Sequence, residues 1–233
     1  MENIYTIPVN EAFDACLEEK NEKNANKNCP FCEMRRVLEE NELELILGAS
    51  MMEPDTRIKT NEQGFCKRHF SMLLRRKNRL GLALILESHL AHVEKEAGAF
   101  LSSDKKLTKI ESSCYICQRI DYHFVRMIGT AVDLYESDRG FADKVGRVPY
   151  YCLGHYNAFL SAGKKALKRS AASDFERTVK KVNDAYLKSI QEDVSWFCKK
   201  FDYRYDAEPW GNAKDSPERA IRFLAGDDTD TGK

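Results

Sequence analysis

Apolar side chains recur at helical spacing along most of the chain. Between Cys32 and Gly48 they stand mainly three, four or seven residues apart, which predicts a helix over that segment. A second, longer pattern begins at Cys66 and continues to about Leu101. Its middle part, residues 80–86, is apolar on every side, so we expect a central helix that is covered by its neighbours.

The second half of the chain follows the same plan. The periodicity predicts helices over about residues 117–137, 152–168 and 174–201. A serine, a proline and a glutamate at the start of residues 216–225 are typical of a helix N-terminus, and they predict a short last helix. No segment alternates between apolar and polar residues as a strand does. The pattern therefore predicts an all-α fold, a helical bundle with an internal pseudo-repeat.

Six of the eight cysteines fall into a pattern that occurs twice. Each copy has a Cys-x-x-Cys pair and, after a gap of 34 or 35 positions, a Cys-x-x-His pair. The aromatic residues around the second pair recur as well, in FCKRHF and YCLGHY. Such self-similarity indicates two related halves, which we place at residues 1–105 and 106–233 and expect to pack as one globular unit.

We expect each copy of the pattern to close around one metal ion. The predicted ligands of the first site are Cys29, Cys32, Cys66 and His69, and those of the second are Cys114, Cys117, Cys152 and His155. A cysteine and a histidine three positions apart share one face of the first helical turn, where the positive helix N-terminus favours a thiolate. For the first site to close, residues 49–65 have to run back along the preceding helix in an extended form.

Three thiolates and one imidazole favour zinc, which prefers four tetrahedral ligands of these types. Four protein ligands leave no position for an activated water molecule, so we expect two zinc ions that stabilise the fold rather than catalyse a reaction. An iron–sulfur cluster that uses the same ligands is the main alternative. Clusters of buried, reduced cysteines without a metal are a second alternative.

The charge balance bears on possible partners. The chain carries 37 basic and 37 acidic residues, and a net charge of zero argues against a general nucleic-acid-binding protein. The basic runs at residues 75–79 and 164–169 could follow a phosphate backbone, but solvated helix faces explain them equally well. The N-terminus does not resemble a secretory signal, and the longest apolar run is too short to span a bilayer. We therefore expect a cytoplasmic protein without membrane contact, whose cysteines stay reduced.

A few residues outside the repeat also carry chemical groups of interest. His89 and His92 lie one helical turn apart and could form a further metal site, but we interpret them as polar helix positions. Cys16 and Cys198 have no counterparts in the repeat, and we expect both to be buried as small hydrophobic residues. We expect the aromatic residues 196–205 to pack the last helix onto the bundle, with a ligand pocket or a partner surface as the alternative.

The motifs CPFC, PDTR and GFCKRH, in this order, resemble those of an uncharacterised bacterial family that is catalogued as a domain of unknown function. CYIC, YCLGH and the closing segment KKFDYRYDAEPWGNAKDSPERAIRFLAG are similar to the later segments of that family, so the resemblance covers about residues 29–226. It implies a bacterial cytoplasmic protein that has the same two four-ligand sites. It implies no activity, substrate or catalytic residue.

These observations predict a zinc-stabilised helical binding or interaction protein. Its partner is a protein or a small molecule that the sequence does not identify. An iron–sulfur or redox enzyme and a regulator that contacts nucleic acid are the alternatives. The chain has no glycine-rich phosphate loop and no Ser-His-Asp or Cys-His nucleophile signature, which argues against an enzyme.

Overall fold

A computed structural model describes residues 3–17, 29–97 and 104–227 of the chain. Within these residues every regular element is a helix and none is a strand, which confirms the predicted all-α fold. The chain divides into two compact units: unit 1 comprises residues 1–36 and 125–233, and unit 2 comprises residues 37–124. The boundary that we placed at residues 105/106 therefore falls inside unit 2 and not between the units.

Two long helices are shared between the units, α2 (Pro30–Leu47) and α7 (Tyr115–Ser137). The other helices of unit 1 are α1 (Thr6–Leu17), α8 (Arg139–Arg147), α9 (Leu153–Ala166), α10 (Arg169–Lys199) and α11 (Ser216–Ala225). The other helices of unit 2 are α3 (Pro54–Gln63), α4 (Lys67–Arg75), α5 (Arg79–Ala97) and α6 (Asp104–Glu111). The helices α2, α7, α9, α10 and α11 confirm the corresponding predictions. None of the described helices is long and apolar enough to span a membrane.

The long helix that we predicted from Cys66 is wrong in one respect, because it consists of two helices. The backbone of Arg76 is extended, so α4 ends there. Asn78 then opens α5: its side-chain Oδ1 accepts a hydrogen bond from the backbone N–H of Gly81 at 2.8 Å, as an N-cap residue does. The predicted end of this helix near Leu101 lies outside the described residues.

The apolar middle of α5 is covered on one side only. Leu82 and Ile85 are buried, and α5 packs against α3. Leu80 is 70% exposed, so the prediction of a helix covered all round is wrong. The helix lies along the surface of unit 2.

The chain between α2 and α4 does not run back in an extended form as we predicted. A short 3₁₀ helix, η2 (Ala49–Met52), is followed by α3. Pro54 fits the first turn of α3 because its missing N–H has no partner to lose there. Gly64 ends the helix with a φ of 57°, a left-handed conformation that glycine adopts readily.

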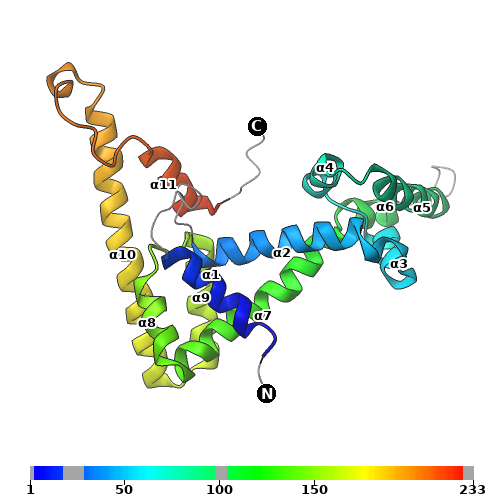
Figure 1. The fold of residues 1–233 in the computed structure, drawn as a ribbon, viewed down its shortest axis with the longest axis horizontal. Coiled ribbons are helices and arrows are strands. Elements are labelled where there is room, and N and C mark those ends of the chain that lie inside the picture. The colour runs from blue at the N-terminus through cyan, green and yellow to red at the C-terminus, as the bar shows by residue number, and fades with distance from the viewer. Residues whose placement is uncertain (1–2, 18–28, 98–103, 228–233) are drawn as a thin grey trace. The chain divides into compact units, whose positions relative to one another are not determined.

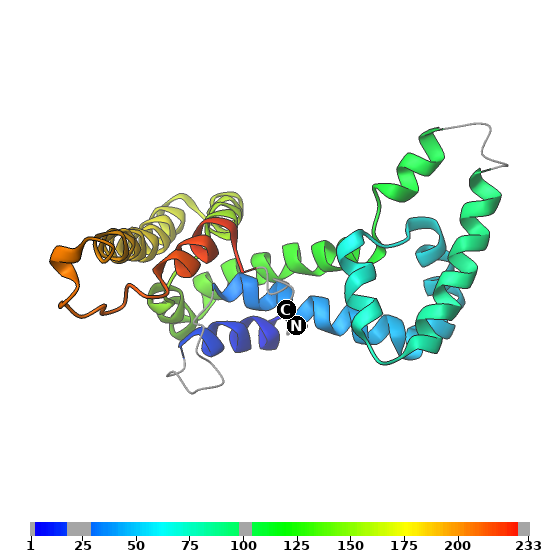
Figure 2. The ribbon, with the colours of Figure 1, turned by 90° about the horizontal axis from the view of Figure 1, so that it is seen from above.

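Unit 1 is organised around α10, which packs against α8, α9 and α11. Figure 1 shows α8 beside this long helix, and both views show α9 along it (Figures 1 and 2). The core of unit 1 is a cluster of fully buried aromatic rings, with the centroids of neighbouring rings 4.7 to 5.9 Å apart. The rings belong to Phe13, Phe31, Phe141, Phe159 and Phe175.

Unit 2 has a separate core of aliphatic and aromatic side chains from α2, α4, α5 and α7. Leu43, Leu73 and Ile116 are fully buried there. Cys114 is also a member of this core, so one sulfur ligand is embedded among apolar neighbours. Each unit therefore has its own hydrophobic core and, as described next, its own group of metal ligands.

Candidate metal centres

The structure gathers the eight predicted ligands into two groups of three sulfurs and one imidazole, but not the groups that we predicted. Site 1 consists of Cys29, Cys32, Cys152 and His155, and site 2 consists of Cys66, His69, Cys114 and Cys117. Each site therefore combines the Cys-x-x-Cys pair of one motif copy with the Cys-x-x-His pair of the other copy. The predicted grouping within each copy is wrong. All ligands of site 1 belong to unit 1, and all ligands of site 2 belong to unit 2.

The path of the chain explains why each Cys-x-x-Cys pair meets the Cys-x-x-His pair of the other motif copy. Helix α2 begins in unit 1, immediately after Cys29, and its last residues belong to unit 2. A return to Cys29 would need an extended segment after α2. That segment is helical instead, so Cys66 stays in unit 2 and meets the start of α7 there.

The separations between ligand atoms match the edges of a tetrahedron around one ion. Zinc bonds of ~2.3 Å to sulfur and ~2.0 Å to nitrogen give edges of ~3.8 Å between two sulfurs and ~3.5 Å between sulfur and nitrogen. In site 1 the Cys32 and Cys152 sulfurs lie 3.7 Å apart, and His155 Nδ1 lies 3.1 to 3.7 Å from the three sulfurs. In site 2 the Cys66 and Cys117 sulfurs lie 3.9 Å apart. The geometry of both sites suits a single tetrahedral ion.

Aromatic packing and one asparagine position the ligands of site 1. Phe31, between the two cysteines of the first pair, lies in the core of unit 1 with its ring 6.0 Å from that of His155. Tyr151, immediately before Cys152, is fully buried. Asn183 of α10 accepts a hydrogen bond from the Tyr151 N–H and donates one to its carbonyl, at 2.9 and 2.8 Å. The backbone that carries Cys152 is therefore fixed to α10.

The segment after α11 covers site 1. The backbone N–H of Asp227 donates a hydrogen bond to the Cys32 sulfur at 3.4 Å. A Cβ atom on Gly226 would lie 3.7 Å from the Cys152 sulfur and 3.8 Å from the Cys32 sulfur. The hydrogen bond from the Asp227 N–H favours the thiolate form of Cys32, which is the form that a metal requires. Sequence analysis missed this role of Asp227, because a backbone donor has no side-chain signature.

Two hydrogen bonds join the segments that carry the cysteines of site 2. The Tyr115 N–H donates to the Gly64 carbonyl at 3.0 Å, and the Ser113 hydroxyl donates to the Gln63 carbonyl at 2.7 Å. The residues just before Cys66 thus pair with the residues on either side of Cys114. This pairing brings the starts of α4 and α7 together at site 2.

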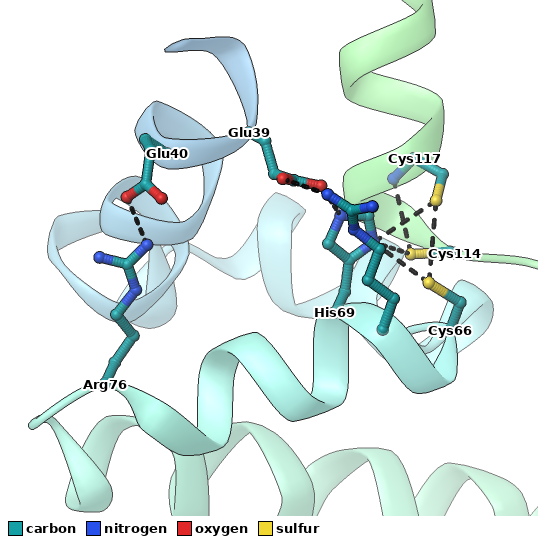
Figure 3. A network of polar contacts seen from close by, with 8 residues as sticks. Glu39, Glu40, Cys66, His69, Arg76, Cys114 and Cys117 are labelled. Carbon is teal, nitrogen blue, oxygen red and sulfur yellow. Dashed lines mark hydrogen bonds and ion pairs between the residues drawn. The ribbon is translucent and has the colours of Figure 1, made fainter. Parts of the chain in front are cut away.

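Glu39 of α2 holds the histidine of site 2 from the side opposite the sulfurs (Figure 3). His69 Nδ1 faces the sulfurs of Cys66 and Cys114 at 3.2 Å, while its Nε2 lies 3.1 Å from Glu39 Oε1. Arg68 donates to the other carboxylate oxygen at 2.8 Å. A carboxylate behind a ligating imidazole fixes the ring orientation and makes the imidazole a better donor to the metal.

The charges around His69 are consistent with this arrangement. Burial raises the pKa of Glu39, but hydrogen bonds with His69 and Arg68 outweigh it and leave this pKa below its usual value. Burial lowers the pKa of His69, but hydrogen bonds with Cys114 and Glu39 raise it to about 10. In the absence of a cation the ring is therefore charged, and a bound divalent ion would take over this positive charge.

The thiols of each group hold their protons unequally when no cation is bound. In site 1, burial raises the pKa of Cys29, whereas hydrogen bonds from the other two thiols lower that of Cys152. In site 2, burial raises the pKa of Cys117. Burial opposes ionisation of Cys114 as well, but hydrogen bonds from His69 and from backbone N–H groups lower its pKa to about 6. Additional thiolates in either group need a cation to offset their mutual repulsion.

Replacing Glu39 by glutamine should weaken metal binding at site 2 alone. The amide oxygen of the new side chain still accepts a hydrogen bond from His69, but the negative charge is lost, so we expect the affinity of site 2 to fall ~10- to ~100-fold. Competition with a chromogenic chelator measures this change. Glu40→Gln is the matched control, because Glu40 is the next residue of α2 and pairs with Arg76 instead of the site (Figure 3). Equal affinities in both variants would contradict the role of Glu39.

The remaining candidate residues lie outside both groups. His89 is buried, and its Nδ1 donates to the Asn61 carbonyl at 3.0 Å. Among the residues that the structure describes, the groups able to hold a metal include neither His89 nor His92. All eight cysteines are free thiols. Cys16 is buried as predicted, but the prediction for Cys198 is wrong, because that residue is exposed near the end of α10.

Residues 1–231 match the model of a protein family that is described as a family of unknown function, DUF6062. No curated protein and no solved structure shows significant similarity to the chain. The match includes both motif copies and all eight ligands of the two sites. The chain therefore belongs to the DUF6062 family, in agreement with the resemblance that its motifs showed.

Proposed function

We propose that the protein binds two zinc ions, one in each unit, and that these ions stabilise a helical binding or interaction protein. The observation that carries the proposal is the convergence of four ligand atoms within 4.8 Å of one another in each of the two sites. Each ion would have four protein ligands and no open position, as in structural zinc sites. We place the protein in the cytoplasm, where its free thiols would stay reduced.

The spacing of the ligands favours a single ion over an iron–sulfur cluster. In an iron–sulfur cluster the ligands bind several iron atoms that are joined by bridging sulfides. The four ligand atoms therefore surround the whole cluster and lie farther apart than they would around one ion. Here the sulfur–sulfur and sulfur–nitrogen separations are those of one tetrahedral ion. The single imidazole in each site also suits zinc.

An exposed aromatic loop after α10 supports the binding part of the proposal. The buried Lys200 donates hydrogen bonds to the carbonyls of Asp206 and Glu208, at 3.2 and 2.9 Å, and thereby holds the loop in one conformation. Phe201 and Tyr203 are 76% and 83% exposed on this loop. Rigid exposed aromatic rings are typical of contact residues in protein interfaces.

The contacts of this loop differ from our prediction that the aromatic residues 196–205 pack the last helix onto the bundle. Aromatic residues at the end of α10 pack on rings of the loop that follows it, for example Trp196 on Tyr205, with ring centroids 5.7 Å apart. Helix α11 is attached to the bundle by another aromatic group instead. Its Phe223 contacts Tyr150 and Tyr186, with ring centroids 5.9 and 5.4 Å away.

Each basic run contains a residue that pairs with an acidic residue of its own unit. Arg76 pairs with Glu40, and Lys164 pairs with Glu176 at 3.0 Å. Partial neutralisation reduces the field that would attract a phosphate backbone. We therefore favour a protein or small-molecule partner over nucleic acid.

Elemental analysis of anaerobically purified protein tests the proposal. We expect two zinc ions per chain, little iron and a colourless solution, because a closed zinc site has no visible absorption. Brown protein with stoichiometric iron would contradict zinc in favour of a cluster. Protein that folds with neither metal would contradict both and leave two groups of reduced thiols.

A further inference from the structure

The two sites differ in how well their sulfurs are shielded. In site 1, Cys29, Cys32 and Cys152 are at most 7% exposed, and the segment around Asp227 covers the site. In site 2, only Cys114 and His69 are buried, whereas Cys66 and Cys117 are partly exposed. The sulfurs are therefore all buried in site 1, whereas two of the three sulfur ligands of site 2 are partly accessible to solvent.

A cavity in unit 2 reaches site 2 at Cys66. It has a volume of about 670 Å³ and is lined in part by Cys66, Phe65, Phe70, Leu74 and His89. Its volume is sufficient for a small molecule to lie next to the metal centre. Helix α4 and residues 64–66 before it supply most of the wall, and His89 of α5 and the end of α6 complete it.

The two accessible cysteines are also neighbours. The sulfurs of Cys66 and Cys117 lie 3.9 Å apart, although 51 positions separate the residues along the chain. A metal-bound cysteine is a thiolate, and the thiolate is the form that oxidants attack. Access and thiolate character together determine which cysteines are oxidised.

We propose that Cys66 and Cys117 are a modification site for small hydroperoxides, at which oxidation releases the metal of site 2. The inference rests on the proposed function, because it requires a metal ion in that site. The Cys66 thiolate attacks the peroxide: an S–O bond forms, the O–O bond breaks, and the leaving oxygen takes up a proton and departs as water from hydrogen peroxide or as an alcohol from an organic hydroperoxide. The Cys117 thiolate then attacks the oxidised sulfur, forms the disulfide and displaces hydroxide, which a proton converts to water.

In this reaction the two thiolates lose two electrons and hydrogen peroxide is reduced to two water molecules. The metal loses two of its four ligands and retains only Cys114 and His69. A site with two ligands does not hold zinc at structural affinity, so the ion leaves. Site 1 keeps its metal because its sulfurs are covered.

Hydrogen peroxide added to the two-zinc protein, with a chromogenic zinc chelator present, tests this inference. We expect one zinc ion per chain to leave at least ~10-fold faster than the second, as exposure controls oxidation. Peptide mass spectrometry should then find a disulfide between Cys66 and Cys117. Simultaneous release of both ions, earlier release from site 1, or a disulfide between Cys114 and Cys117 would each overturn the inference.

Two variants at exposed leucines of unit 2 test the route through the cavity. Leu74→Trp places a larger side chain in the wall of the cavity and should slow the fast release several-fold without loss of zinc. Leu80→Trp is the control, because Leu80 is exposed but does not line the cavity. Equal rates in the two variants would exclude this route. Protein without two zinc ions before oxidation would contradict the proposed function itself, which separates the two failures.

Discussion

Replacing Cys29 and Cys152 together should leave one zinc ion per chain, whereas replacing Cys29 and Cys66 together should leave none. The first pair of substitutions, to serine, removes two ligands from site 1 and leaves site 2 complete. The second pair removes one ligand from each site, and a site that has lost a thiolate binds zinc far more weakly. Elemental analysis after dialysis against a weak chelator distinguishes one ion from none.

The comparison is well controlled because both double variants contain Cys29→Ser and differ only in the second position. A grouping within each motif copy predicts the reverse result: the variant with Cys66→Ser would keep one ion and the variant with Cys152→Ser would lose both. Cys198→Ser should keep two ions, since Cys198 is exposed and belongs to neither site. The reverse result would contradict the arrangement of the chain in both units.

The identity of the ligands could be predicted from the sequence because it is a local signal. Each pair needs only three positions of spacing and a helix that starts there, and both features are visible in the residues themselves. The partners of each pair depend on where the intervening helices carry the chain. We did not predict the helix in this connection, because α3 has the sequence PDTRIKTNEQ, in which Thr60 is the only buried residue. Without an apolar stripe, a helix looks like a polar loop.

The surroundings of the metal ligands could not be predicted for a related reason. Glu39 is one of several acidic residues along α2, and only the packing of α2 against α4 selects it as the partner of His69. Asn183 lies in the middle of α10, 32 positions from the Tyr151 backbone that it holds. Groups of this kind act at a distance along the chain, so a single sequence gives no spacing by which to recognise them.

Removing the metal from one site should destabilise the unit that contains it and spare the other. Each unit has its own core and its own four ligands, so each ion binds only the folded form of its unit. An ion present at a thousand times its dissociation constant contributes ~4 kcal/mol to the free energy of unfolding. In the variant with Cys114→Ser and Cys117→Ser, we therefore expect amide hydrogens of α3 and α5 to exchange up to ~1,000-fold faster.

The helices α8, α9 and α10 serve as the internal control in the same measurement, because site 1 remains complete in that variant. Their amide protection should stay within a few fold of the unaltered protein. Chelation of both ions should remove protection throughout and lower the helical signal in circular dichroism. If protection survived complete chelation, the aromatic core of unit 1 and the aliphatic core of unit 2 would be sufficient for folding. The metal ions would then have a role other than stabilising the fold. The accessible thiolates of Cys66 and Cys117 in site 2 make oxidation-dependent metal release the first such role to test.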